Sequence, residues 1–120
     1  MNKKKKILIV EDELLIAKVM MMQFQNRGFE VFHVPEAEKA IEITKQIHPD
    51  LIIMDIHLQN NSSGIVAAQK IREAKFDIPI IFTTGNSLAN TLENISNIKY
   101  SKALSKPIDF DQLLLQVNNF

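Results

Sequence analysis

The feature that most constrains the fold is a set of four short apolar runs, each of which stops at a side chain capable of chemistry. The four are Ile7 to Val10 before Glu11 and Asp12, Leu51 to Met54 before Asp55, Ile78 to Thr83 before Thr84, and Ala103 to Ser105 before Lys106. Unbroken runs of β-branched and aliphatic residues are typical of parallel strands that are buried on both faces. Because the carboxyl ends of such strands share one edge of the sheet, we expect these reactive side chains to converge.

Apolar residues at helical spacing separate the runs. Leu14, Leu15, Val19 and Met22 predict a helix after the first run, and Gly28 suits its carboxyl end. Further strands are expected over 29–34, from Pro79 onward, and over 100–104. Further helices are expected from a first turn with Pro35 to Ile47, over 65–72, from a cap at Ser87 to Ile95, and from Asp109 and Gln112 onward. A polar loop is expected over 59–63. A strand and a helix thus alternate five times, which predicts an α/β fold with a parallel sheet and helices on both faces.

Length and composition fit one small globular domain. The chain has 120 residues, of which 46% are hydrophobic, so we expect residues 1–120 to form one domain, with residues 1–5 as a flexible basic tail. Basic and acidic residues number 14 each, and this zero net charge disfavours partners such as nucleic acid or an acidic membrane surface. There is no cysteine and no apolar stretch of about 20 residues, so we expect a protein of the cytoplasm without disulfides or a membrane span.

The acidic residues at the strand ends suggest phosphoryl chemistry with a metal ion. Asp55 is the candidate nucleophile, because a positioned carboxylate can accept a phosphoryl group as an acyl phosphate. Glu11 and Asp12 would repel each other, and a hard cation such as Mg²⁺ would relieve this repulsion. The simpler alternatives are that Asp55 is a turn residue and that Asp12 caps the following helix.

A lysine and a hydroxyl complete the candidate site. Lys106 carries the positive charge that an aspartyl phosphate needs, and Pro107 keeps it out of helical geometry. Thr84 offers a hydroxyl, and Gly85 after it would allow the backbone to approach closely. Thr83 is a competing hydroxyl, which strand alternation should turn away from the site.

Four motifs together resemble those of response-regulator receiver domains of two-component signalling. They are the residues 7–13, ILIVEDE; 50–56, DLIIMDI; 79–85, PIIFTTG; and the pair Lys106-Pro107. The resemblance covers nearly the whole chain and implies a flavodoxin-like (βα)5 fold, a three-layer sandwich with a five-stranded parallel sheet of order 2-1-3-4-5. It also implies a signalling switch rather than an enzyme, one that catalyses only its own phosphorylation and dephosphorylation.

The resemblance also implies roles for particular residues. Mg²⁺ or Mn²⁺ would be held by Asp12 and Asp55, by Glu11 partly through water, and by the backbone carbonyl of His57. Thr84 would move toward the phosphoryl group on Asp55, and the surface of the fourth helix, fifth strand and last helix would report that movement. The implied partners are a sensor histidine kinase or a histidine phosphotransfer protein, and the same surface suits a homodimer. The Lys106-Pro107 bond is often cis in such domains.

One departure from the family pattern keeps alternatives open. Receivers usually carry tyrosine or phenylalanine three residues before the lysine, where this chain has Ala103; Tyr100 or Phe82 could contribute instead. The alternative function is therefore a pseudo-receiver that binds a partner with weak or absent phosphorylation-coupled switching. A phosphohydrolase would usually want a second aspartate at His57, and a flavodoxin would want a phosphate-binding loop at residues 11–13; the sequence disfavours both.

Overall fold

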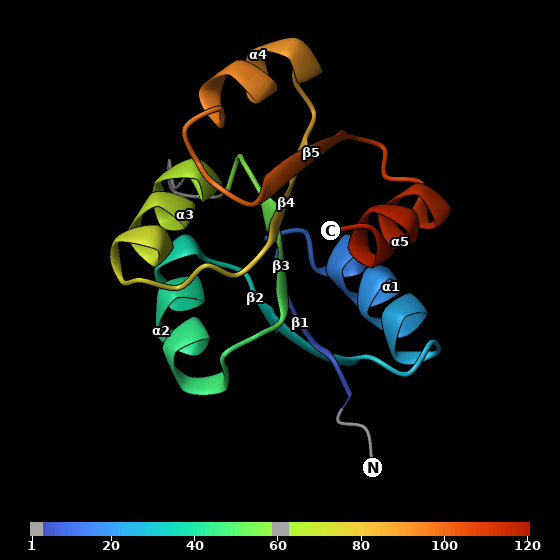
Figure 1. The fold of residues 1–120 in the computed structure, drawn as a ribbon. Coiled ribbons are helices and arrows are strands. Elements are labelled where there is room, and N and C mark those ends of the chain that lie inside the picture. The colour runs from blue at the N-terminus through green and yellow to red at the C-terminus, as the bar shows by residue number, and fades with distance from the viewer. Residues whose placement is uncertain (1–3, 59–62) are drawn as a thin grey trace.

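The computed structural model describes residues 4–58 and 63–120, which form a five-stranded parallel sheet with helices on both faces (Figure 1). In chain order the elements are β1 (Lys6–Val10), α1 (Leu14–Gln25), β2 (Glu30–Val34), α2 (Ala37–Ile47), β3 (Leu51–Asp55), α3 (Gly64–Glu73), β4 (Ile80–Thr84), α4 (Leu88–Asn94), β5 (Ser101–Ser105) and α5 (Phe110–Asn118). The strand order is β2-β1-β3-β4-β5, so the predicted fold class and sheet order are confirmed.

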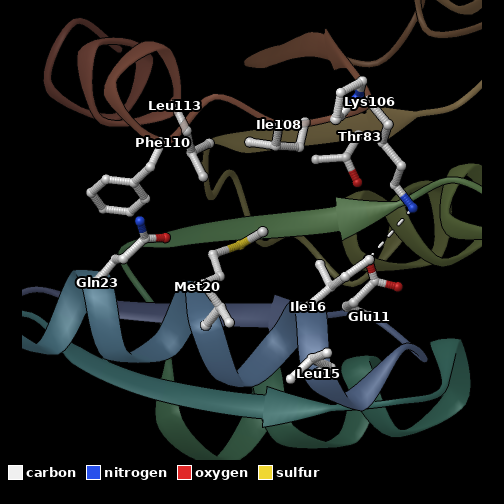
Figure 2. Close-up of a pocket in the computed structure, with 12 residues that line it drawn as sticks. Glu11, Leu15, Ile16, Met20, Gln23, Thr83, Lys106, Ile108, Phe110 and Leu113 are labelled. Atoms are coloured by element: carbon white, nitrogen blue, oxygen red, sulfur yellow. Dashed lines mark hydrogen bonds and ion pairs between the residues drawn. The ribbon is translucent and has the colours of Figure 1, made fainter.

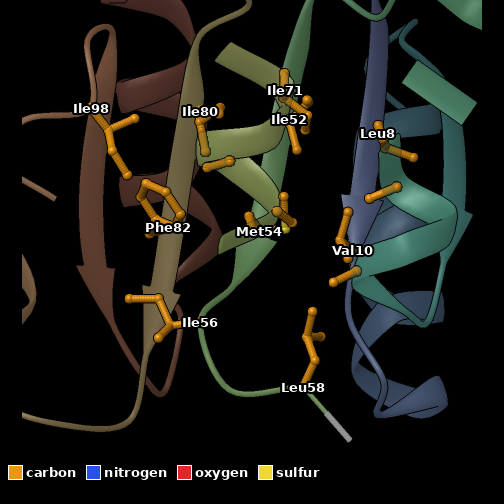
Figure 3. Close-up of a cluster of buried hydrophobic side chains, with 14 of the residues drawn as sticks. Leu8, Val10, Ile52, Met54, Ile56, Leu58, Ile71, Ile80, Phe82 and Ile98 are labelled. Atoms are coloured by element: carbon orange, nitrogen blue, oxygen red, sulfur yellow. The ribbon is translucent and has the colours of Figure 1, made fainter. Parts of the chain in front are cut away.

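The unbroken apolar runs are explained by two cores, one on each face of the sheet. On β1, Leu8 and Val10 point to the face covered by α2 and α3, while Ile7 and Ile9 point to the face covered by α1 and α5. Figure 3 shows the first of these cores, with side chains from the central strands packed against Ile71 of α3. A central strand therefore needs an apolar residue at every position, because neither of its faces meets water.

The apolar stripe that predicts α1 lies on the wrong side of that helix for the core. Leu15 is 76% exposed and Met22 is 61% exposed, whereas Ala17, Met20 and Phe24 are buried against the sheet. The helix is apolar on nearly all sides, so spacing alone could not decide which stripe the sheet would bury. The consequence is an exposed apolar face on α1.

Several element boundaries differ from those predicted, for local reasons. Phe29 lies outside β2, because its N–H donates to the carbonyl of Phe24 and closes the end of α1 (3.2 Å), after Gly28 at φ +88°. Tyr100 lies outside β5, in a left-handed turn with φ +53°. Pro35 precedes the N-cap residue of α2 instead of lying in its first turn, and Ile78 and Pro79 precede β4.

Capping and the amino-terminal segment were predicted in part. Ser87 caps α4, and the Asp109 carboxylate accepts the N–H groups of Asp111 and Gln112 at the start of α5. Lys6 belongs to β1, so the basic tail does not extend to it, and its N–H donates to an Asp50 carboxylate oxygen (2.7 Å). Residues 1–3 of the predicted tail and 59–62 of the predicted polar loop lie outside the described residues.

Gly64, the first residue of α3, lies very close to the strand that carries Asp55. A Cβ atom at this position would stand 2.2 Å from the carbonyl oxygen of Asp55 and 2.7 Å from Cγ of Met54. Since the nearest atom belongs to backbone, it cannot move aside as a flexible side chain would. The closeness of α3 to β3 therefore requires glycine.

We predict that Gly64→Ala lowers the free energy of unfolding by roughly 2 to 4 kcal/mol, because the methyl group overlaps the β3 backbone. Urea denaturation checks this. Gly85→Ala is the matched control, since nothing lies within 4 Å of a Cβ there, and it should change the free energy by less than about 0.5 kcal/mol. Equal stabilities for the two variants would contradict the close packing of α3 on β3.

Candidate functional site: an acidic pocket at the carboxyl edge of the sheet

Three carboxylates from the ends of β1 and β3 meet at one edge of the sheet. Glu11, Asp12 and Asp55 each offer an oxygen atom, and these oxygens all lie within 4.8 Å of one another. Glu11 and Asp55 are buried, while Asp12 is half-buried. The sheet register explains the meeting, because β1 and β3 are adjacent strands and Val10 pairs with Met54, one residue before each acidic position.

The ammonium group of Lys106 lies against two of these carboxylates. Its Nζ is 3.0 Å from Asp55 Oδ2. It is also 3.4 Å from Glu11 Oε1, the contact drawn in Figure 2. Burial acts to lower the pKa of Lys106, but the hydrogen bond and the charges of Asp55 and Glu11 outweigh it and raise the pKa above the usual value. Lys106 is therefore a fixed positive charge, 3.0 Å from the candidate nucleophile. The Lys106-Pro107 peptide bond is cis, as the resemblance implied.

Glu11 has a strongly perturbed pKa. Burial raises the pKa of its carboxyl to about 7; the Glu13 N–H and Lys106 act to lower it, and the charge of Asp55 adds to the rise. Its carboxylate accepts the N–H of Glu13 (3.2 Å), and its backbone carbonyl lies 2.7 Å from Nε2 of His33 on β2. Asp12 does not cap α1, because the N-cap residue is Glu13 and it makes no side-chain cap.

The donor set fits a hard divalent cation. Three oxygen ligands of like charge in a partly buried pocket repel one another, and the pKa of Glu11 is raised first by burial and further by the charge of Asp55. Mg²⁺ and Mn²⁺ prefer carboxylate and water oxygens, and a bound ion would replace repulsion by attraction. Asp12 is the most exposed of the three.

The two neighbouring threonines of β4 point to opposite faces of the sheet. Thr83 lines a groove between α1 and α5 (Figure 2), whereas the Thr84 hydroxyl accepts the Asn86 N–H (3.1 Å) and lies 3.3 Å from Thr91 Oγ1 of α4. The expectation that alternation separates the two hydroxyls is thus confirmed. Within the described residues the Thr84 hydroxyl bonds to Asn86 and Thr91 and not to a carboxylate.

The loops after β3 and β4 are joined by a side-chain hydrogen bond. Asn86 Nδ2 lies 2.7 Å from Nε2 of His57, and the His57 N–H donates to Asp55 Oδ1 (3.2 Å). A Cβ at Gly85 would meet open space, so no part of the described protein approaches the backbone there; the close approach within the protein occurs at Gly64. Sequence reasoning also missed Thr91 and the contact of His33 with Glu11, because neither follows a strand end.

An apolar groove of about 640 Å³ opens beside the acidic pocket. One wall is α1, with Leu15, Ile16 and Val19, and the other includes Ile108 and Phe110 before and in α5 (Figure 2). Glu11 and Lys106 line the same groove, so the exposed apolar face of α1 continues to the charged site. In the part of the chain that the structure describes, no helix is long and apolar enough to cross a membrane.

The doubly wound α/β fold and the acidic pocket at the carboxyl edge of its sheet together indicate the class of protein. A family profile described as the response regulator receiver domain matches residues 7–118. The chain therefore belongs to the response regulator receiver family of two-component signalling, whose members are signalling switches rather than enzymes acting on a separate substrate.

Relatives of known sequence agree with this assignment. The chain is 29% identical over 112 residues to the transcriptional regulatory protein DltR of Streptococcus agalactiae, covering 93% of this chain and 50% of that protein. It is 30% identical over 112 residues to the regulatory protein AtoC of Escherichia coli, covering 93% of this chain and 24% of AtoC. The chain thus spans half or less of the length of these relatives.

Solved structures support the fold. The receiver domain of a LuxO repressor protein from Vibrio parahaemolyticus superposes with a TM-score of 0.88 at 24% identity, covering 98% of this chain and 89% of that one. The Vibrio cholerae chemotaxis protein CheY4 superposes with a TM-score of 0.89 at 20% identity, covering 98% of each chain.

The raised pKa of Glu11 leads to a prediction about stability. In metal-free protein between pH 4.5 and about 7, folded Glu11 holds a proton that the unfolded chain has released. Folding then takes up a proton, so the free energy of unfolding falls as the pH rises across this window and levels off above about 7. The fall due to Glu11 is on the order of 2 kcal/mol.

Urea denaturation at a series of pH values, with a chelator present, measures this fall. Glu11→Gln should remove it, whereas Glu38→Gln on the surface of α2 should leave the pH profile of the native protein unchanged. Identical pH profiles for native protein and Glu11→Gln would show that Glu11 titrates normally.

Proposed function

We propose that this domain accepts a phosphoryl group on Asp55, with Mg²⁺ or Mn²⁺, and thereby switches a partner or an output surface. The observation that carries the proposal is that Asp55 lies 3.0 Å from Lys106 Nζ and in one cluster with the carboxylates of Glu11 and Asp12. A nucleophile, a fixed cation and a set of metal ligands are the parts that phosphoryl transfer to a carboxylate requires.

The proposed reaction forms an acyl phosphate. An oxygen of the Asp55 carboxylate bonds to the phosphorus of the donor as the bond from phosphorus to the donor nitrogen or oxygen breaks, and later hydrolysis returns the carboxylate and inorganic phosphate. Lys106 neutralises the charge on the transferring group. When bound, the metal would neutralise charge on the phosphoryl oxygens, held by Asp12, Asp55, the His57 carbonyl and, partly through water, Glu11. Thr84 would then donate a hydrogen bond to the phosphoryl group.

The proposed donors are a sensor histidine kinase or a histidine phosphotransfer protein. A donor must bring its phosphohistidine to Asp55, and the exposed apolar face of α1 continues into the groove that ends at Glu11 and Lys106. Large exposed apolar patches mark protein interaction sites. We therefore place the donor on α1. Leu88 and Leu92 of α4, which are 38% and 48% exposed, are available for the predicted homodimer through α4, β5 and α5.

The alternative is a pseudo-receiver that binds a partner without being phosphorylated. Ala103 is the residue that favours it, since it leaves β5 without the usual aromatic side chain. The contact of Lys106 with Asp55 and the cluster of three carboxylates favour the phosphoacceptor. Phosphorylation and metal binding separate the two functions directly.

We predict that acetyl phosphate labels the native protein when Mg²⁺ is present, and that labelling falls to background when Mg²⁺ is chelated or in Asp55→Asn. The reason is that the amide of asparagine cannot form the acyl phosphate. Intact-mass spectrometry or a phosphate-binding gel measures the labelled fraction.

Asp77→Asn is the matched control for this experiment. Asp77 is exposed and precedes β4, at the opposite edge of the sheet, so its variant should be labelled like the native protein. Persistent labelling of Asp55→Asn would sink the assignment of Asp55. Absence of both labelling and Mg²⁺ binding in the native protein would instead establish the pseudo-receiver.

The proposed binding of the phosphoryl donor to α1 gives a second prediction. Val19→Arg puts a charge on the α1 face of the groove, and we expect it to slow phosphotransfer from a histidine kinase at least tenfold, because about 1.4 kcal/mol of lost docking energy has this effect. Labelling by acetyl phosphate should not change, since this small donor needs no docking surface. Transfer from a panel of purified sensor kinases, followed with radiolabelled phosphate, makes the comparison.

Leu92→Arg on α4 is the control for kinase docking. It should be phosphorylated by the kinase at the native rate, and the same variant analysed by sedimentation tests the predicted dimer. If Val19→Arg and Leu92→Arg receive phosphate from the kinase equally fast, the donor does not bind α1.

A further inference from the structure

The Thr84 hydroxyl is tied to α4 through Thr91. Both threonines are buried, with 0% and 4% exposure, and their hydroxyl oxygens lie 3.3 Å apart. All of α4 lies in the described part of the chain, and Thr91 is its buried residue. Figure 1 shows α4 at the β5 end of the sheet, and its main contacts with another helix or strand are with β5.

The hydrogen bond between the Thr84 and Thr91 hydroxyls can have two arrangements, which differ in the hydroxyl that donates. Thr91 Oγ1 also lies 3.1 Å from the carbonyl oxygen of Ser87, and one hydroxyl has one proton to donate. Thr91 can therefore donate to Ser87 and accept from Thr84, or donate to Thr84 directly. In either arrangement the Thr84 hydroxyl, which also accepts the Asn86 N–H, is held on the side of α4.

The two aromatic residues named above as substitutes for the one missing at Ala103 lie away from the Thr84 hydroxyl. Tyr100 is 57% exposed, and its ring lies 6.0 Å from the guanidinium carbon of Arg72. Phe82 is fully buried in the core beside α3, and its neighbour on β5 is Ala103. In the described residues, Thr91 is the α4 side chain that hydrogen-bonds to the Thr84 hydroxyl.

We propose that Thr91 is a positioning residue that couples the state of Asp55 to α4 through its hydrogen bond with Thr84. The proposal rests on the proposed function, because it assumes that a phosphoryl group on Asp55 attracts the Thr84 hydroxyl. When the Thr84 hydroxyl moves toward Asp55 to donate to a phosphoryl oxygen, it moves away from Thr91, and the bond between the two threonines breaks in either arrangement. The buried side chain of α4 then loses a partner, and the helix is held less tightly to the sheet.

Thermodynamic linkage between the Thr84–Thr91 bond and binding of a phosphoryl group determines the direction of the expected effects. Since the bond to Thr91 opposes the movement of Thr84 toward Asp55, its removal should favour the phosphorylated conformation. A ligand that mimics the phosphoryl group should consequently bind more tightly when Thr91 has no hydroxyl, while α4 should respond to it less.

Thr91→Val tests this, because valine keeps the shape of threonine and removes the hydroxyl. The probe is beryllofluoride with Mg²⁺, and the readouts are its affinity and the amide hydrogen exchange of α4. In the native protein we expect beryllofluoride to speed exchange in α4. In Thr91→Val we expect fast exchange before beryllofluoride is added, little further change after it, and an affinity about threefold to tenfold higher.

Two further variants separate coupling from a merely structural role. Thr91→Ser keeps the hydroxyl and should restore the native affinity and the native response of α4. Thr44→Val is the matched control: Thr44 is a fully buried helical threonine whose hydroxyl donates to the carbonyl of Ala40 (2.7 Å), in α2, away from Thr84. It should leave beryllofluoride affinity and the response of α4 unchanged.

The outcomes distinguish the inference from the function on which it rests. A native response of α4 to beryllofluoride in Thr91→Val, or Thr91→Ser behaving like Thr91→Val, would overturn the coupling role while leaving phosphorylation of Asp55 intact. Failure of the native protein to bind beryllofluoride and to accept phosphate would overturn the proposed function, and the coupling role with it.

Discussion

The interaction on which the site depends is the contact of Lys106 with the carboxylates of Glu11 and Asp55. Three acidic groups within 4.8 Å of one another, two of them buried, would be costly without a counter-charge. Lys106 supplies that charge from the end of β5, the far edge strand of the sheet. Because β1, β3 and β5 each contribute one charged residue to this contact, it also ties the loops at the carboxyl edge together.

Close packing at the carboxyl edge of the sheet fixes the backbone that carries the acidic side chains. The amino-terminal end of α3 approaches the Asp55 carbonyl so closely that only Gly64 fits, and the Gly64 N–H donates to the carbonyl of Ile56, the residue before His57 (2.9 Å). On the other side, His33 of β2 contacts the backbone carbonyl of Glu11. Neighbouring elements thus fix the backbone on which the acidic side chains stand, a requirement for phosphoryl transfer by positioned groups. The chain belongs to the receiver family because the family profile matches residues 7–118. The chemistry at Asp55 is our proposal for this member.

Local patterns were reliable where both faces of an element are buried and weaker elsewhere. The runs before Asp55 and Thr84 favoured central strands, because strands buried on both faces are apolar at nearly every position. In α1 the reverse holds: apolar residues lie on nearly every side, so the stripe with Leu15 and Met22 looked like a core face and is exposed. That exposed stripe lies next to the acidic pocket and is the surface on which we propose that the phosphoryl donor docks, whereas periodicity alone predicts that it packs in the core.

The sequence by itself determined the order of strands and helices, the class of fold and the reactive residues at the strand ends, because these depend on periodicity and on the shared edge of a parallel sheet. Tertiary structure alone decided which groups touch. It placed Lys106 on Asp55, turned Thr84 toward Thr91 and Thr83 toward α1, and made Gly64 rather than Gly85 the position of close approach. Lys106 and Asp55 lie 51 residues apart in the chain, while Thr84 with Thr91 and Asp55 with Gly64 each join a strand to the helix that follows it. Their distances arise only when the helices pack on the sheet.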